Sequence, residues 1–165
     1  MTAAESLKAA DPAKPKARHK SFTYRTSAKW TSGRSGVLGA EGKPALLVSS
    51  PPEFKGEAGR WTPEELFVAA IELCTMTTFA SFAQRQNLPL LGYRSEAEGL
   101  LEFVDDGYRF TRVILRPTIT LADPAAVEPA AKAMRDAHEA CLIGRSVRAE
   151  VVVEPRLEVA KAAGA

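Results

Sequence analysis

Cysteine is the residue type in this chain best suited to covalent chemistry, because its thiolate is both a nucleophile and a redox group. The 165-residue sequence has two cysteines, Cys74 and Cys141. A thiol in apolar surroundings has a raised pKa and is inert, so a reactive thiol needs a cation nearby. None of the residues three or four positions from Cys74 is a cation: Ala70, Ile71, Thr77 and Thr78. Cys74 is therefore either a small buried side chain or a reactive thiol whose activating arginine comes from elsewhere in the fold.

Cys141 falls at or just past the end of a second predicted helix, where the helix dipole is negative and disfavours a thiolate. This position suits a cysteine that closes a disulfide after another thiol has reacted. A buried thiol that ends the helix is the alternative. His138 lies one turn before Cys141, and His19 is the only other histidine. A complete zinc site is not expected from so few ligands, so we predict no metal.

Composition and charge exclude several classes of function. The apolar share of 45% and the charged share of 25% are ordinary globular values, and the length fits one domain. The net charge is +2 with both signs interspersed, which differs from the basic stripe of a nucleic-acid-binding protein. No apolar run is long enough to cross a bilayer, and residues 1–20 lack the apolar core of a signal peptide. We therefore expect a cytoplasmic protein that binds neither nucleic acid nor membrane.

The elements that must position the cysteines begin with strands. Residues 1–20 are predicted to be a disordered leader. Strict alternation over 22–30 predicts a first strand, with one face formed by Phe22, Tyr24, Thr26, Ala28 and Trp30. Residues 31–36 form a turn with glycines on both sides of Arg34. Strands over 37–41 and 45–49 follow, and then a loop over 51–59.

A strong N-terminal helix signal precedes Cys74 in the sequence. Thr62 is the N-cap, Pro63 occupies the first helical position, and Glu65 completes a capping box. The helix that follows, to about Gln86, is apolar on nearly all sides. Such a helix must be buried on all sides, and a small domain rarely encloses one alone. We therefore expect a second copy of the chain to cover it.

The second half of the chain predicts a hairpin, a helix and a last strand. Two long strands over 93–103 and to residue 121 meet at the turn Asp105-Asp106-Gly107, and Pro117 indicates an edge or a bulge. A helix over 124–141 follows Asp123 as its cap, and the last strand covers 147–154. The order predicts an α+β fold with mostly antiparallel sheet. The single domain spans 21–156, with a frayed tail over 157–165.

Three separated stretches resemble one known family. Residues 61–74 read Trp-Thr-Pro-Glu-Glu-Leu-Phe-Val-Ala-Ala-Ile-Glu-Leu-Cys. This stretch resembles the Pro-Glu-x-Leu run ending in cysteine that opens the central helix of the OsmC/Ohr family. Gly33-Arg34-Ser35-Gly36 resembles the Gly-Arg-Asp-Gly turn of the organic hydroperoxide reductases. Residues 137–141, Ala-His-Glu-Ala-Cys, resemble the helix end that carries the family's second cysteine. The likeness spans about residues 22–155.

The resemblance implies a role for each residue of a catalytic site. Cys74 would be the peroxidatic cysteine, and Cys141 the resolving cysteine that forms an intramolecular disulfide with it. Arg34 would lower the pKa of Cys74 and polarise the peroxide, and Glu64 would hold Arg34 by a charge-assisted pair. By themselves, Arg34 would be an exposed turn residue and Glu64 would complement the helix N-terminus. Glu64 and Cys74 are about 15 Å apart along a straight helix, so either Arg34 bridges much of this gap or a second chain completes the site.

The resemblance also implies a fold, an assembly and a branch of the family. It predicts an N-terminal β-hairpin that wraps around two long helices in an intertwined homodimer with shared active sites. Leu142 stands where hydroperoxide reductases usually carry proline, and Ser35 where the turn aspartate is usual. The loop over 49–56 also resembles an OsmC-like branch.

By this resemblance the protein would be a thiol peroxidase that reduces organic hydroperoxides. An apolar pocket would be lined by Phe67, Met76, Phe79 and Phe82, although the same side chains could be simple core. No nicotinamide or flavin motif is present, so we expect no cofactor and an external dithiol reductant, such as a dihydrolipoyl protein. Two alternatives stay open: a non-catalytic dimeric protein that binds a small apolar ligand, and a redox sensor.

Overall fold

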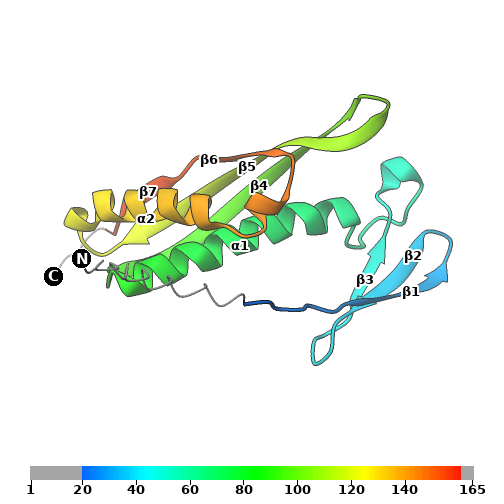
Figure 1. The fold of residues 1–165 in the computed structure, drawn as a ribbon, viewed down its shortest axis with the longest axis horizontal. Helices are drawn as coiled ribbons and strands as arrows, with labels where there is room; N and C mark the ends of the chain where they lie inside the picture. The colour runs from blue at the N-terminus through cyan, green and yellow to red at the C-terminus, as the bar shows by residue number, and fades with distance from the viewer. Residues whose placement is uncertain (1–19, 161–165) are drawn as a thin grey trace, which may run out of the picture.

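The computed structural model describes residues 20–160, which form a small sheet and a larger helix-and-sheet unit (Figure 1). The small sheet is antiparallel and contains β1 (Ser27–Ser32), β2 (Ser35–Gly39) and β3 (Leu46–Ser49). The larger unit contains α1 (Pro63–Arg85), β4 (Leu90–Val104), β5 (Gly107–Leu121), α2 (Val127–Ala140), β6 (Glu150–Val153) and β7 (Arg156–Val159). The small sheet lies beside the N-terminal end of α1, away from α2 (Figure 1).

The larger sheet is built around β5. β4 pairs with β5 antiparallel along its length, whereas β6 and β7 both pair with β5 in parallel, one after the other. Alternate residues of β5 are buried beneath α1 and α2, including Val113, Leu115, Ile119 and Leu121. Two helices therefore cover one face of the sheet, and the predicted α+β class with mostly antiparallel pairing is confirmed.

Local sequence signals place the ends of both helices. The Thr62 N–H donates to the Glu65 carboxylate at 2.9 Å, and the Glu65 N–H donates to the Thr62 hydroxyl at 3.1 Å, so the predicted capping box is present. The Asp123 carboxylate accepts from the Ala125 N–H at 2.8 Å and begins a short 3-10 turn that leads into α2. A cap of this kind stabilises a helix by about 1 kcal/mol.

The predicted β4–β5 turn is also confirmed. Asp105 and Asp106 have φ angles of 49° and 68°, and Val104 pairs with Gly107 across the turn. Two consecutive residues with positive φ make the primed two-residue turn whose twist matches that of the flanking strands.

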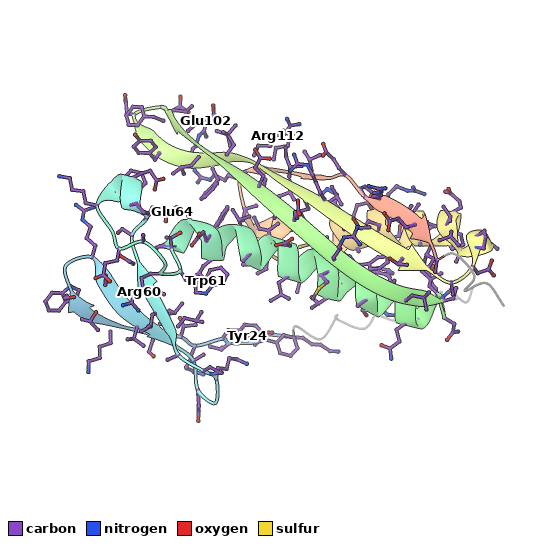
Figure 2. All side chains as sticks on the ribbon, turned by 180° about the vertical axis from the view of Figure 1, so that it is seen from behind. Tyr24, Arg60, Trp61, Glu64, Glu102 and Arg112 are labelled. Carbon is purple, nitrogen blue, oxygen red and sulfur yellow. The ribbon has the colours of Figure 1, made fainter. Side chains whose placement is uncertain are left out.

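The first strand is shorter than the sequence pattern predicts. β1 begins at Ser27, and residues 20–26 run extended without a partner strand. The Tyr24 side chain is 89% exposed, and Figure 2 shows it projecting from this extended segment. The strict alternation over 22–30 predicted a strand from residue 22, but residues 20–160 supply no partner strand for the part before Ser27.

The prediction that Pro117 marks an edge or a bulge is wrong. β5 is the central strand, and Pro117 pairs with Ser95 and is fully buried. On the other side of β5 the parallel partner changes at this point, because β6 pairs up to Leu115 and β7 begins at Thr118. A proline is accommodated here because Pro117 lies in the gap between β6 and β7, where β5 needs no N–H donor on that side.

The C-terminal region also departs from the prediction. The last strand predicted over 147–154 is the shorter β6, and the chain then pairs again as β7, with Leu157 packed against the core. The frayed tail predicted over 157–165 is therefore wrong for residues 157–159. Residues 161–165, like the leader over 1–19, lie outside the described residues.

Within one chain α1 is buried on one side only. Its buried residues recur every fourth position and form a single stripe: Ile71, Thr75, Phe79 and Ala83. Leu73, on another side, is 57% exposed. By length and composition alone α1 could cross a membrane, with a mean hydropathy of 1.7, a property that core helices of soluble proteins share. Within one chain the N-terminal hairpin does not wrap around the helices, so most of this apolar surface stays uncovered.

Candidate active site around the two cysteines

The fold brings the two cysteines together. Cys74 lies halfway along α1 and is half-buried, whereas Cys141 directly follows the last residue of α2 and is 1% exposed. The two free thiols lie close enough across the α1–α2 contact for each to shift the pKa of the other. Two sulfurs in such contact can exchange a proton or form a disulfide.

Hydrogen bonds lower the pKa of Cys74. Burial raises the pKa of this thiol, but the Ile143 N–H, the Cys141 thiol, the Leu142 N–H and the Thr78 hydroxyl all stabilise its thiolate, and the net pKa is below the ordinary value. A lowered pKa increases the thiolate fraction near neutral pH, and the thiolate is the reactive form. Cys74 is thus activated within one chain by donors other than the arginine that the sequence led us to expect.

Cys141 has the opposite shift. Burial raises the pKa of its thiol, and the neighbouring Cys74 raises it further. The Thr75 hydroxyl at 3.5 Å and the Gly144 N–H at 3.3 Å only partly offset this rise. Of the two thiols, Cys74 therefore loses its proton more readily than Cys141. This division matches an attacking thiolate beside a thiol that reacts second.

The donors to the sulfurs come from the turn that follows α2. The Cys141 carbonyl accepts from the Arg145 N–H at 3.0 Å, and the Leu142 carbonyl accepts from the Ser146 hydroxyl at 2.8 Å. The N–H groups of 142, 143 and 144 are directed at the sulfurs. Successive N–H groups of this kind form a concavity that favours negative charge. The sequence does not indicate these N–H donors, because every residue except proline carries one. The Thr78 hydroxyl could have been predicted as a donor, because Thr78 lies one helical turn after Cys74.

Arg34 is not brought to Cys74 within one chain. It lies exposed in the turn between β1 and β2, and its guanidinium donates a hydrogen bond to the Phe54 carbonyl. It is not among the groups that shift the pKa of Cys74. The small sheet that carries Arg34 adjoins the N-terminal end of α1, whereas Cys74 is at the middle of the helix (Figure 1).

Glu64 lies in the first turn of α1 with an unsatisfied oxygen. Its Oε2 is buried and has no hydrogen-bond partner among residues 20–160, and the same holds for Oε1 of Glu72, two turns further along. Both side chains line a groove of about 360 Å³ that Trp61 borders. Figure 2 shows Glu64 and Trp61 at the end of α1 nearest the small sheet. A buried acceptor without a donor is costly, so this groove is suited to a donor from outside the chain.

The four predicted pocket residues separate into two groups. Phe79 is 0% exposed and packs near Tyr93 in the core, and Phe82 packs against the same core beneath the Arg85 guanidinium. Their prediction as pocket residues does not hold. Met76 is half-buried. Phe67 lies further towards the N-terminal end of α1, next to Glu64.

An aromatic groove that the sequence did not reveal surrounds Phe67. Phe67 stacks on Phe110 with ring centroids 4.6 Å apart, and Phe54 meets Tyr108 edge-on at 5.5 Å. Together with Glu64 these rings line a groove of about 310 Å³ between α1 and the β4–β5 hairpin. The rings come from three segments, so no single periodicity could have grouped them.

Metal chemistry has no candidate centre in the part of the chain that the structure describes. Within residues 20–160, no three His, Cys, Asp or Glu side chains lie close enough to hold an ion. Within one chain the candidate site consists of the cysteine pair and its hydrogen-bond donors, and Arg34 and Glu64 lie apart from it.

Comparison with known proteins agrees with this geometry. The family model for OsmC-like proteins matches residues 56–156, which include α1, both cysteines and the larger sheet up to the start of β7. The chain belongs to the OsmC-like family. The resemblance seen in the sequence is thereby confirmed.

Individual relatives of this OsmC-like protein cover most of the chain. An uncharacterized protein of Bacillus subtilis, YmaD, is 26% identical over 135 residues, which are 79% of this chain and 90% of that protein. An OsmC-like protein of unknown function from Vibrio cholerae is 27% identical, with a TM-score of 0.76 over 82% of this chain and 99% of its own. An organic hydroperoxide resistance protein from Legionella pneumophila is 28% identical, with a TM-score of 0.66 over 84% of this chain and 100% of its own. The family thus includes organic hydroperoxide resistance proteins.

Proposed function

We propose that this OsmC-like protein is a cytoplasmic thiol peroxidase that reduces organic hydroperoxides. The observation that carries the proposal is the cysteine pair, in which the pKa of Cys74 is lowered and that of Cys141 is raised. A pair that only packed two helices together would need no donors directed at its sulfurs. The similarity to the hydroperoxide resistance protein of Legionella pneumophila supports the substrate class.

The reaction follows from the order of the two pKa values. The Cys74 thiolate attacks the outer oxygen of the hydroperoxide, the O–O bond breaks, and an alcohol leaves after taking up a proton. Cys74 is then a sulfenic acid. Cys141, as its thiolate, attacks that sulfur and displaces the hydroxide, which leaves as water, so that a Cys74–Cys141 disulfide forms. An external dithiol, such as a dihydrolipoyl protein, returns two electrons by thiol–disulfide exchange.

In the proposed enzyme, Arg34 and Glu64 of one copy of the chain act at Cys74 of a second copy. Neither reaches Cys74 within one chain, because both belong to the end of α1 where the small sheet lies. A homodimer that covers the exposed side of α1 would place Arg34 and Glu64 of one copy beside Cys74 of the other. The unsatisfied Glu64 oxygen supports this arrangement, since a guanidinium is the donor that best satisfies a carboxylate.

The aromatic groove is suited to bind the apolar tail of the proposed substrate. Its four rings, Phe54, Phe67, Tyr108 and Phe110, lie beside Glu64 rather than in the core. Aromatic linings bind apolar ligand groups well. We therefore assign the tail to this groove rather than to Phe79 and Phe82, which pack in the core.

The test is steady-state consumption of cumene hydroperoxide with dihydrolipoamide as reductant, in wild type, Cys74→Ser and Cys141→Ser. We expect turnover that disappears in Cys74→Ser. In Cys141→Ser we expect a sulfenic acid on Cys74 that a dimedone probe traps, without an intramolecular disulfide. Peroxide-driven disulfide formation without turnover would indicate a redox sensor. A Cys74 that excess peroxide leaves unmodified in the folded protein would rule out the peroxidase and favour a non-catalytic binding protein.

A further inference from the structure

Arg34 is held in place by the segment that follows β3. Its guanidinium donates to the Phe54 carbonyl, and its own carbonyl accepts from the Ser50 N–H at 3.2 Å and from the Ser49 hydroxyl at 3.3 Å. Both ends of the residue are thus bound to residues 49–54. The position of the guanidinium depends on whatever fixes this segment.

Glu57 fixes it from the other end of the loop. The Glu57 carboxylate accepts from the Ser35 hydroxyl at 2.7 Å, and the Glu57 N–H donates to the Ser49 hydroxyl at 2.9 Å. Ser35 and Ser49 are partners across β2 and β3, and their hydroxyls meet at 3.2 Å. We call these three residues, Ser35, Ser49 and Glu57, the serine–glutamate cluster. Its two serines are buried, so each depends on the other members for its hydrogen bonds.

The loop between Ser49 and Glu57 has little freedom to adopt another path. A Cβ on Gly56 would lie 1.5 Å from the Ser50 carbonyl oxygen, so only glycine permits this approach. The Gly56 N–H donates to the Pro51 carbonyl at 3.1 Å. The carbonyl that receives the Arg34 guanidinium, that of Phe54, lies inside this closed loop.

We propose that Glu57 is a positioning residue for Arg34, and hence for the peroxide chemistry at Cys74. The inference rests on the proposed function, in which Arg34 reaches Cys74 through a second copy. Glu57 touches neither the guanidinium nor a sulfur. It binds the hydroxyl of the residue after Arg34 and closes the loop whose carbonyl holds the guanidinium. Glu57 therefore acts on the turn from the loop, through the residue next to Arg34.

The experiment compares Glu57→Ala with Glu53→Ala, a matched control in the same loop whose side chain has no hydrogen bond in the structure of residues 20–160. Two quantities are measured: kcat/KM for cumene hydroperoxide, and the pKa of Cys74 from the pH dependence of its alkylation by iodoacetamide. In Glu57→Ala we expect kcat/KM to fall by about 10- to 100-fold, the range for a misplaced catalytic group. We expect the pKa of Cys74 to rise. Glu53→Ala should match wild type, and Glu57→Gln, which keeps an acceptor for Ser35, should recover part of the loss.

A double variant separates positioning from general destabilisation. If Glu57 acts through Arg34, then Arg34→Ala with Glu57→Ala should be no less active than Arg34→Ala alone. The inference would be overturned if the activity losses of Arg34→Ala and Glu57→Ala added up in the double variant. It would also be overturned if Glu57→Ala lowered the Tm and left the pKa of Cys74 unchanged. Should Glu57→Ala fail to fold, Ser35→Ala removes the same hydrogen bond from the other partner and is judged by the same outcomes. The alkylation measurement needs no turnover. A wild type without peroxidase activity would therefore overturn the proposed function, and the pKa of Cys74 in Glu57→Ala would still decide the role of Glu57.

Discussion

Replacing Leu142 with proline removes one hydrogen-bond donor to the Cys74 thiolate and little else. The Leu142 side chain is 72% exposed, so its loss disturbs no core. Its carbonyl keeps the bond from the Ser146 hydroxyl, and the preceding residue, Cys141, already has the extended ψ of 111° that a following proline requires. The variant therefore tests the main-chain N–H itself. By the family resemblance, it also introduces the residue that hydroperoxide reductases usually carry.

The size of the effect follows from the kind of bond that is lost. A hydrogen bond to a charged group contributes about 1.5–3 kcal/mol, and the partial exposure of Cys74 favours the lower figure. About 1.4 kcal/mol corresponds to a factor of ten in the thiolate population at a pH below the pKa. We therefore expect Leu142→Pro to alkylate at Cys74 roughly tenfold more slowly than wild type at neutral pH, with the whole pH profile moved upward.

Alkylation by iodoacetamide, with the modified residue identified by mass spectrometry, measures this directly, because Cys141 is buried and reacts poorly. Leu142→Ala is the control, since it removes the side chain and keeps the N–H. If proline and alanine variants react at the same rate as wild type, the main-chain donors do not activate Cys74, and the explanation for its lowered pKa is wrong.

Three further predictions concern other parts of the molecule. The rate of Cys74 oxidation should rise with pH and level off above the pKa of Cys74. Because the Cys141 thiol lowers that pKa, stopped-flow measurements on Cys141→Ala should find the rise at higher pH. An unchanged pH profile would contradict the interaction between the two thiols. Phe79→Ala should lower the free energy of unfolding by about 3–5 kcal/mol in urea titrations, whereas Phe67→Ala should mainly raise KM for hydroperoxides with bulky tails; equal stability losses would show that the groove is core. Leu73→Asp, on the exposed side of α1, should shift a dimer to a monomer in sedimentation analysis, and a wild type that is already monomeric would refute the assembly.

Features set by neighbouring residues were predictable from the sequence. The capping box involves Thr62 and Glu65, three positions apart, and the Asp105–Asp106 turn needs only its own two residues and the strands on either side. These signals placed α1 and the long hairpin correctly. The cysteines also came together as expected, because the resemblance supplied a pairing that local patterns alone left open.

Features set by distant contacts were not predictable. The Ser35–Glu57 bond joins residues 22 positions apart, and the donors at 142 and 143 are main-chain groups that every residue except proline carries. Phe79 and Phe67 are both aromatic residues of α1, and a helix that is apolar on all sides gives no pattern to tell which one faces the core. Tyr24 stays exposed among residues 20–160, although the alternation around it is typical of a strand with one buried face.

The change of partner strand at Pro117 has a consequence for how the sheet opens. β5 holds β6 and β7 through two separate sets of hydrogen bonds, and no ladder bond joins the two sets across the proline. The C-terminal strand β7 can then exchange its amide hydrogens, or be removed by a protease, without loosening β6. β6 begins four residues after the turn that contains the donors to Cys74, so we expect hydrogen exchange to find β7 opening without loss of protection at β6 or at that turn.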